Sequence, residues 1–213
     1  MSQDLISPHL GAYLDELVPE RPPELQRMEE IARERDFPII GPACGHLCYQ
    51  IARMIGARTV FELGSGYGYS TAWFARAVSE NGGGTVHHVV WDAELSEQAR
   101  GHLKALGLDG VVRYSVSEAV EALRSEAGPF DLIFNDIDKH AYPESLGAIE
   151  EKLRPGGVLV IDNMLWRGRI FDEGDTSPET SGVREVTRLL TRSPRWTSSL
   201  IPIRDGVIVA VRR

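Results

Sequence analysis

Short runs of β-branched and other apolar residues alternate with longer amphipathic segments from about residue 59 onward. Gly, Asn or Asp closes most of these runs, which is typical of β-α-β units in a parallel sheet. The pattern predicts strands at residues 59–63, 85–91, 111–115, 130–135 and 157–161. It predicts the helices between them at residues 70–78, 96–106, 118–125 and 143–153.

The N-terminal part of the chain does not follow this alternation. Residues 5–35 are polar and are interrupted by Pro19, Pro22 and Pro23, with one helix predicted before these prolines. A second helix is predicted from Glu24 onward, where apolar residues recur at helical spacing. We therefore expect residues 1–37 to form a helical appendage to a core of residues 38–213.

The C-terminal part predicts a change of strand direction. An irregular, Gly-rich and acidic stretch at residues 168–181 precedes a helix at 183–191 and strands at 196–203 and 207–211. The turn between these strands, Arg204-Asp205-Gly206, contains the Asp-Gly pair of a tight hairpin. The sheet should begin parallel and end antiparallel, and the absence of repeats or linkers predicts one domain.

Composition and charge narrow the class of protein. The chain has 213 residues, 42% of them apolar and 25% charged, as in one ordinary globular domain. A chain of this length buries roughly 70% of its unfolded surface, so a bound metal would serve chemistry instead of stability. The net charge of −8, from 23 basic and 31 acidic residues, argues against non-specific binding of nucleic acid.

Neither cysteines nor targeting segments suggest a secreted or membrane protein. Cys44 and Cys48 lie four residues apart in a predicted helix and are expected to be reduced core thiols. The first ten residues contain Asp4 and Pro8 and no basic run before an apolar stretch, so no secretory signal is visible. No segment reaches the ~20 apolar residues of a membrane helix, and we expect a cytoplasmic protein.

A glycine loop follows the first predicted strand and opens the next helix, where an α/β sheet brings its backbone close to ligands. Its spacing, Gly64-x-Gly66-x-Gly68, differs from the dinucleotide fingerprint, and the lysine of a P-loop is missing. Glu62 would repel a pyrophosphate but would suit the ammonium group of S-adenosylmethionine. Glycines at such a turn can also serve packing alone.

Acidic residues follow the next predicted strand, where a carboxylate commonly holds ribose hydroxyls. Asp92 is the better ribose candidate of the two acids at this point. Glu94 also fits the acidic first turn of a solvated helix, which the helix dipole favours.

Hard oxygen ligands follow two further strands, which should be neighbours in the sheet. Asp136 ends one strand, and Asp162 with Asn163 ends the next, 26 residues later. Two carboxylates and one amide suit Mg²⁺, which leaves other positions to water or substrate. The alternatives are a helix N-cap for Asp136 and a turn at Asp162-Asn163.

Lys139 lies three residues after Asp136 and is a candidate base. A divalent cation and a sulfonium close to an ammonium group favour its neutral form, which can accept a proton. The same residue elsewhere would be an ordinary surface lysine.

Three blocks of the chain, at residues 62–70, 130–139 and 156–168, resemble the signature blocks of the cation-dependent O-methyltransferases. That family includes catechol O-methyltransferase, plant caffeoyl-CoA O-methyltransferases and many bacterial relatives. The resemblance runs from about Ile40 to the C-terminus and includes the closing hairpin at 201–207. It implies the α/β class I methyltransferase fold, a doubly wound, Rossmann-like sheet of seven mostly parallel strands, with S-adenosylmethionine as cofactor.

The resemblance also implies roles for individual residues. Lys139 and Asp136 match the catalytic positions, and Asp136, Asp162 and Asn163 match the metal ligands. Cofactor contacts are implied or expected at Ile40, Glu62, Gly64, Ser65, Gly66, Tyr69, Ser70, Asp92, Glu118, Ala119 and Asp136.

Two positions depart from the family pattern. The ribose-binding acid of the family aligns with Val90, two residues before Asp92. Ser117-Glu118-Ala119 stands where Gly-Asp-Ala is common, so Glu118 and Ala119 are the corresponding adenine contacts. Both departures concern the cofactor and leave the metal ligands and the base intact.

The expected reaction is methyl transfer from S-adenosylmethionine to a small aromatic vicinal diol held by Mg²⁺ or another divalent cation. One alternative is methylation of a hydroxylated uridine in tRNA, for which a positive rim of four arginines is available: Arg35, Arg167, Arg169 and Arg184. Another is a cofactor-binding module without chemistry, which would predict a broken ligand set. The acceptor pocket should involve the appendage and a mobile lid at 166–181, with Trp166, Tyr142 and Phe171 as candidate walls, in a homodimer.

Overall fold

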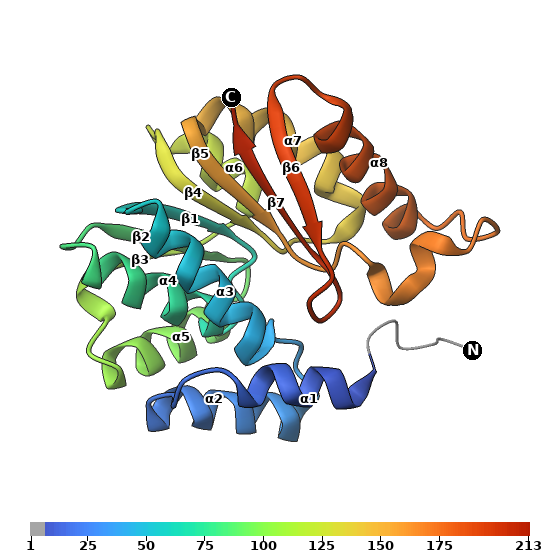
Figure 1. The fold of residues 1–213 in the computed structure, drawn as a ribbon. Coiled ribbons are helices and arrows are strands. Elements are labelled where there is room, and N and C mark those ends of the chain that lie inside the picture. Colours follow the sequence, from blue (N-terminus) through green and yellow to red (C-terminus); the bar gives the residue numbers. More distant parts are fainter. Residues whose placement is uncertain (1–6) are drawn as a thin grey trace.

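The strands form one mixed, seven-stranded sheet in a computed structural model that describes residues 7–213 (Figure 1). Their order is β3-β2-β1-β4-β5-β7-β6, with β7 antiparallel to both neighbours and the other pairs parallel. The strands are β1 (Thr59–Leu63), β2 (Thr85–Val90), β3 (Val112–Val116), β4 (Phe130–Asn135), β5 (Leu153–Ile161), β6 (Trp196–Ile201) and β7 (Val207–Arg212). The predicted fold class, including the closing antiparallel hairpin, is confirmed.

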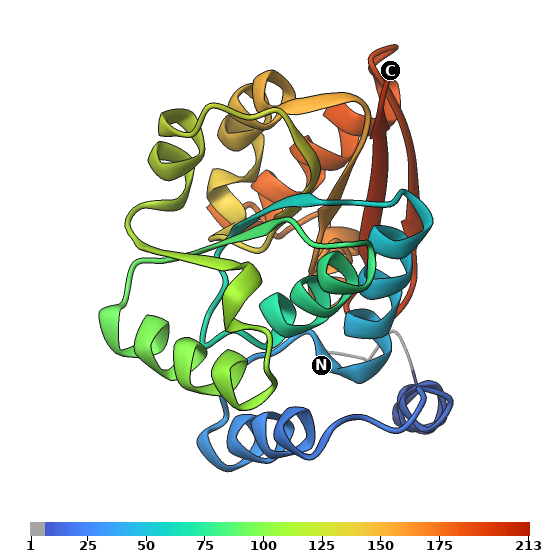
Figure 2. The ribbon, with the colours of Figure 1, turned by 90° about the vertical axis from the view of Figure 1, so that its left-hand side faces the viewer.

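Helices cover both faces of the sheet, and Figure 2 shows the strands passing between them. One face carries α3 (Gly41–Met54), α4 (Tyr69–Glu80) and α5 (Ala93–Ala105), and the other carries α6 (Ala119–Ser125), α7 (Tyr142–Lys152) and α8 (Pro178–Arg192). Successive strand residues point to opposite faces, so the central strands are apolar throughout. In β4, Leu132 and Phe134 pack into the first layer, whereas Ile133 packs into the second.

The two N-terminal helices, α1 (Pro8–Glu16) and α2 (Pro23–Arg35), lie below the sheet in Figure 1. α2 buries Leu25, Met28 and Ala32 against the first core layer. The hydroxyl of Tyr67 donates a 2.8 Å hydrogen bond to the carbonyl of Met28. The predicted appendage is therefore fixed to the glycine loop that follows β1.

Two element boundaries differ from the sequence prediction. α8 begins at Pro178, five residues earlier than predicted, because Ser177 caps the amide of Thr180 and proline is favourable in the first turn. β5 begins at Leu153, where a helix end was predicted. A register shift against β4 accommodates the Pro-Gly segment that follows.

Short 3-10 segments complete the fold: η1 (Asp109–Val111), η2 (Lys139–Ala141) and η3 (Trp166–Phe171). Within residues 7–213, no helix combines the length and the apolar character needed to cross a membrane. The prediction that the N-terminus carries no secretory signal rests partly on residues 1–6, which lie outside the described part of the chain.

Gly182 lets α8 approach η2 closely. A Cβ atom at Gly182 would overlap the backbone carbonyl of Lys139, on the segment that carries the predicted base. Gly147, in the middle of α7, is also helical but has open space where its Cβ would be. The two glycines therefore provide a matched pair.

Gly182→Ala should lower the free energy of unfolding by about 1–3 kcal/mol, because the added methyl overpacks the α8–η2 contact. Gly147→Ala should instead raise it by about 0.5–1 kcal/mol, through the higher helix propensity of alanine. Urea unfolding of both variants measures the difference. Equal stability of the two variants would contradict the role assigned to Gly182.

Candidate functional site

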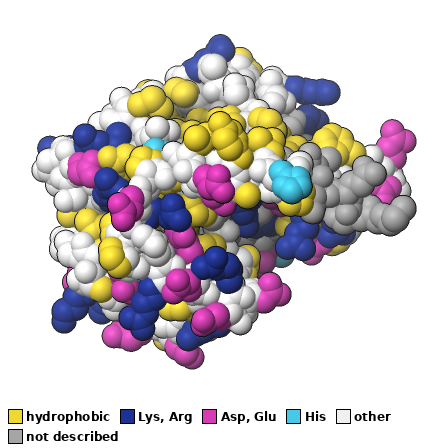
Figure 3. All heavy atoms as spheres, turned by 60° about the horizontal axis from the view of Figure 1, so that its bottom comes forward, with side chains coloured by type: hydrophobic (Ala, Val, Ile, Leu, Met, Phe, Trp, Pro, Cys, Tyr) yellow, Lys and Arg dark blue, Asp and Glu magenta, His cyan; other side chains and the backbone are white. Residues whose placement is uncertain are grey.

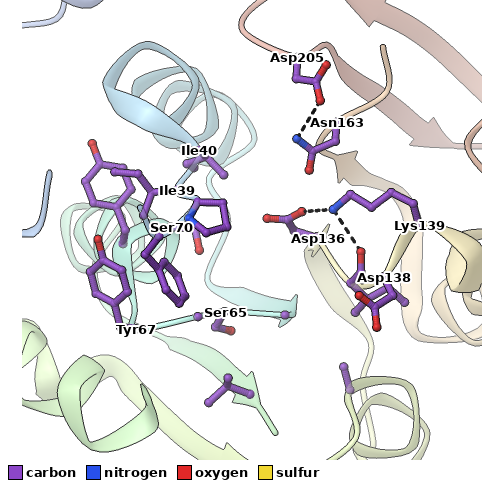
Figure 4. Close-up of a pocket in the computed structure, with 18 of the residues that line it drawn as sticks. Ile39, Ile40, Ser65, Tyr67, Ser70, Asp136, Asp138, Lys139, Asn163 and Asp205 are labelled. Carbon is purple, nitrogen blue, oxygen red and sulfur yellow. Dashed lines mark hydrogen bonds and ion pairs between the residues drawn. The ribbon is translucent and has the colours of Figure 1, made fainter. Parts of the chain in front are cut away.

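A cavity of about 1170 Å³ opens at the carboxyl ends of the parallel strands. Figure 4 shows its two sides, with the side chains around the glycine loop facing a charged group that contains Asp136 and Lys139. The predicted site residues that line the cavity are Ile40, Gly64, Ser65, Gly66, Tyr69, Ser70, Asp92, Glu118, Ala119, Asp136, Lys139 and Asn163. The other two, Glu62 and Asp162, are buried behind its wall.

The three aromatic residues expected as pocket walls have different positions. Trp166 lines the cavity. Tyr142 is fully buried and donates a 3.0 Å hydrogen bond from its hydroxyl to the carbonyl of Asp162. Phe171 is 64% exposed and, like Tyr142, is not part of the lining. Tyr142 therefore supports the strand end that carries Asp162.

The glycine loop is packed against both neighbouring strands. Gly64 has φ +86°, and a Cβ there would lie 2.6 Å from the backbone oxygen of Asp136. Ser65 exchanges hydrogen bonds with Val89 of β2, its amide donating to the carbonyl at 3.0 Å and its hydroxyl accepting from the amide at 2.9 Å. Close packing against Asp136 thus requires glycine at position 64. This agrees with the alternative, left open by the sequence, that glycines at this turn serve packing.

Glu62 is the most unusual polar group on this side of the site. It lies in β1 with no exposed surface, and neither carboxylate oxygen has a hydrogen-bond partner among the described residues. Burial raises the pKa of Glu62 to about 7, although the nearby hydroxyls of Ser70 and Thr71 act in the opposite direction. A ligand cation would supply the partner that the chain does not provide.

The carboxylates of Asp92 and Glu118 both cap helices. Asp92 Oδ1 accepts from the amides of Glu94 at 2.7 Å and Leu95 at 3.1 Å, at the start of α5. Glu118 caps α6 in the same way. Both residues still line the cavity, so their cofactor contacts stay predictions.

The predicted metal ligands Asp136, Asp162 and Asn163, here called the carboxylate cluster, converge at the ends of β4 and β5. Asp136 Oδ1 accepts a 2.8 Å hydrogen bond from Lys139 Nζ. Asn163, held at φ +59°, donates through Nδ2 to Asp205 at 3.2 Å. Figure 4 shows its amide oxygen directed toward Asp136 and Lys139.

The oxygen donors of this cluster fit a hard cation. Asp162 is 1% exposed, and its Oδ1 atom has no partner within residues 7–213. Burial raises the pKa of Asp162 to about 6, with Arg204 lowering it and Asp136 raising it. Residues 7–213 contain no group of three His, Cys, Asp or Glu side chains placed to hold a metal ion. The carboxylate cluster is a different kind of set, since its third member is the amide of Asn163. Metal binding therefore stays a prediction.

The hairpin turn between β6 and β7 also belongs to the site, which sequence reasoning missed. Arg204 and Asp205 line the cavity, and Asp205 Oδ1 accepts from the amide of Arg167 at 2.6 Å. β7 runs antiparallel to β5, with Ile208 opposite Ile161, so the turn must lie beside the carboxyl end of β5. The predicted antiparallel hairpin already implied that its turn lies beside the end of β5. The Arg-Asp-Gly sequence itself indicated only a turn.

The raised pKa of Glu62 predicts a pH-dependent stability of the ligand-free protein. The folded chain retains this proton up to about pH 7, whereas the unfolded chain releases it near 4.5. Stability therefore falls as pH rises through this window, by about 3 kcal/mol in total. Glu62→Gln should match the wild type within about 1 kcal/mol at pH 5 and exceed it by about 2–3 kcal/mol at pH 8.

Urea unfolding in EDTA at both pH values measures this effect. A stability difference between wild type and Glu62→Gln that is the same at pH 5 and pH 8 would show that Glu62 does not titrate as described.

Comparison with known proteins identifies relatives of this chain. A family model described as O-methyltransferase matches residues 20–213. A catechol O-methyltransferase of Niastella koreensis is 30% identical over 181 residues, which cover 81% of each protein. An O-methyltransferase of tomaymycin synthesis from Streptomyces achromogenes, in complex with S-adenosylmethionine, has a TM-score of 0.85 at 27% identity, covering 96% of each chain. An O-methyltransferase of Bacillus cereus, in complex with S-adenosylhomocysteine, has a TM-score of 0.86 at 25% identity, covering 96% of this chain and 97% of that one.

These similarities extend over the glycine loop, the carboxylate cluster and the closing hairpin together. They confirm the enzyme class and the fold that the sequence blocks implied. The chain belongs to the O-methyltransferase family.

Proposed function

We propose that this O-methyltransferase transfers the methyl group of S-adenosylmethionine to a hydroxyl of a small aromatic vicinal diol, with the help of a divalent cation. The observation that carries the proposal is the position of two buried, incompletely paired carboxylates, Glu62 and Asp162, behind one cavity. The catechol O-methyltransferase of Niastella koreensis and the cofactor-bound relatives support the same acceptor and donor.

The glycine-loop side of the cavity is the cofactor side. Glu62 offers its carboxylate to the ammonium of the methionine part, a charge-assisted contact that no cation of the described chain makes. Ile40 and Ser70 line the cavity on this side. Asp92 or another group of this wall would hold the ribose.

The other side of the cavity holds the acceptor. A divalent cation on Asp136, Asp162 and Asn163 would supply Lewis-acid polarisation of the diol hydroxyls. Lys139 Nζ would take the hydroxyl proton while the oxygen bonds to the methyl carbon and the sulfonium leaves as a neutral thioether. The rings of Tyr142 at 5.4 Å and Trp166 at 5.9 Å restrict the position of Nζ, and Asp136 orients it through their 2.8 Å hydrogen bond. Orientation of the two substrates would supply most of the rate.

The alternatives named from the sequence have less support. Arg184 donates hydrogen bonds to four backbone carbonyls of residues 169–175, and Arg169 pairs with Asp175, so two of the four arginines brace the chain instead of forming a free rim. Figure 3 shows acidic and basic side chains interspersed on one face, not a basic surface for tRNA. A module without chemistry would predict a broken ligand set, whereas the carboxylate cluster is complete.

Glu62→Gln should weaken S-adenosylmethionine binding about 10- to 100-fold, because a neutral amide replaces a charged partner of the ammonium group. Isothermal titration calorimetry at pH 8 measures the loss. Glu185→Gln on α8, which removes a half-exposed partner of Arg188, is the control and should bind like the wild type. Unchanged affinity of Glu62→Gln would remove Glu62 from the cofactor site.

Methylation of catechol should fall at least about 100-fold in excess EDTA and return with added Mg²⁺.

Lys139→Ala should lower kcat by about 10²–10⁴ while S-adenosylmethionine affinity stays unchanged, since Lys139 acts on the acceptor proton. Lys104→Ala, at an exposed position near the end of α5, is the matched control. Full activity in EDTA would refute the metal requirement, and full activity of Lys139→Ala would refute the base.

A further inference from the structure

The guanidinium of Arg204 places a permanent positive charge beside Asp162, one of the proposed metal ligands. Its guanidinium nitrogen NH1 lies 2.8 Å from Asp162 Oδ2, in the turn between β6 and β7. The Asp162 side chain is 1% exposed, whereas that of Arg204 is 34% exposed and lines the cavity. The arginine of this ion pair is therefore accessible from the cavity, whereas the carboxylate is buried.

The backbone of Arg204 adopts a conformation that favours glycine. Its φ is +50°, in the left-handed region, which costs a non-glycine residue roughly 1–2 kcal/mol. The side chain of arginine in this position makes the ion pair with Asp162. The turn thus presents the guanidinium to the carboxylate cluster.

Both carboxylates of the cluster have a cationic partner within the chain. Asp136 pairs with Lys139 at 2.8 Å, and Asp162 pairs with Arg204 at 2.8 Å. Asp205, which accepts a 3.2 Å hydrogen bond from Asn163, and Asp138 lie near the same cluster, so the two ion pairs reduce its negative charge without removing it. The guanidinium of arginine stays charged in proteins. A cation that reaches Asp162 must therefore compete with the guanidinium.

We propose that Arg204 is an internal cation that competes with the divalent metal for Asp162 and lowers the metal affinity of the site. This inference rests on the metal requirement in the proposed function and concerns its regulation. The exposed side of Arg204 faces the cavity, so the guanidinium has room to move away when the metal binds. Metal occupancy then depends on the metal concentration available to the enzyme.

Calorimetric titration with Mn²⁺, an oxygen-binding stand-in for Mg²⁺, tests the competition without any activity assay. Arg204→Gln should bind Mn²⁺ at least about 10-fold more tightly than the wild type, the scale on which groups around metal ligands act. Arg204→Gly should do the same and should also relieve the backbone strain, so it guards against loss of folding. Arg204→Lys keeps a positive charge and should show a smaller gain.

Arg188→Gln on α8 removes a half-exposed arginine that does not line the cavity, and it should leave Mn²⁺ affinity unchanged. Thermal unfolding gives an independent readout. In EDTA, Arg204→Gln leaves the buried Asp162 unpaired and should lower Tm, whereas saturating Mn²⁺ should raise Tm more in the variant than in the wild type.

The outcomes separate this inference from the proposed function. If the wild type binds Mn²⁺ and Arg204→Gln binds it no more tightly, the competition is refuted while the metal-dependent reaction stands. If neither wild type nor variants bind Mn²⁺, the metal requirement falls and the competition falls with it. Tighter Mn²⁺ binding and the larger Tm shift in Arg204→Gln together support the proposal.

Discussion

The burial of acidic side chains at the carboxyl ends of parallel strands is the constraint on which the site depends. Glu62 lies near the end of β1 and Asp162 directly follows β5, and both have oxygens without a partner in the described chain. A buried charge without a partner is costly, so each of these groups needs a proton or a cation. The chemistry of the cavity therefore begins with the polar groups that the fold leaves incomplete.

The order of the strands decides which segments can complete these groups. β4 and β5 bring Asp136 beside Asp162, and the antiparallel return of β7 brings the β6–β7 turn to the same edge. Arg204 thus reaches the cluster from a segment 42 residues beyond Asp162. The turn is also fixed to the strand end by Asp205, which accepts hydrogen bonds from Asn163 and Arg167. The strand order therefore positions both the proposed metal ligands and Arg204.

The fold and most of the site could be predicted because both follow from local patterns. Apolar runs and the residues that close them locate the strands, and strand ends locate Asp136 and Asp162. The start of β5 could not be predicted, since its Pro-Gly segment is typical of a turn and only the bulge against β4 accommodates it. The contact of Arg204 with Asp162 is tertiary, and arginine at a turn gives no local signal of it. The helix caps made by Asp92 and Glu118 likewise use side chains that the sequence assigned to the cofactor.

The ligand-free protein avoids unpaired buried charge in three different ways. Asp136 is paired with Lys139 and Asp162 with Arg204, while Glu62 can hold a proton because burial raises its pKa to about 7. Each arrangement has a counterpart in the proposed reaction, in which a metal, a neutral lysine and a cofactor ammonium replace the ion pairs and the proton. The affinity of each ligand is then the difference between two satisfied states, not the full energy of a new contact. We expect a site built in this way to fold without its ligands and to bind them with moderated affinity.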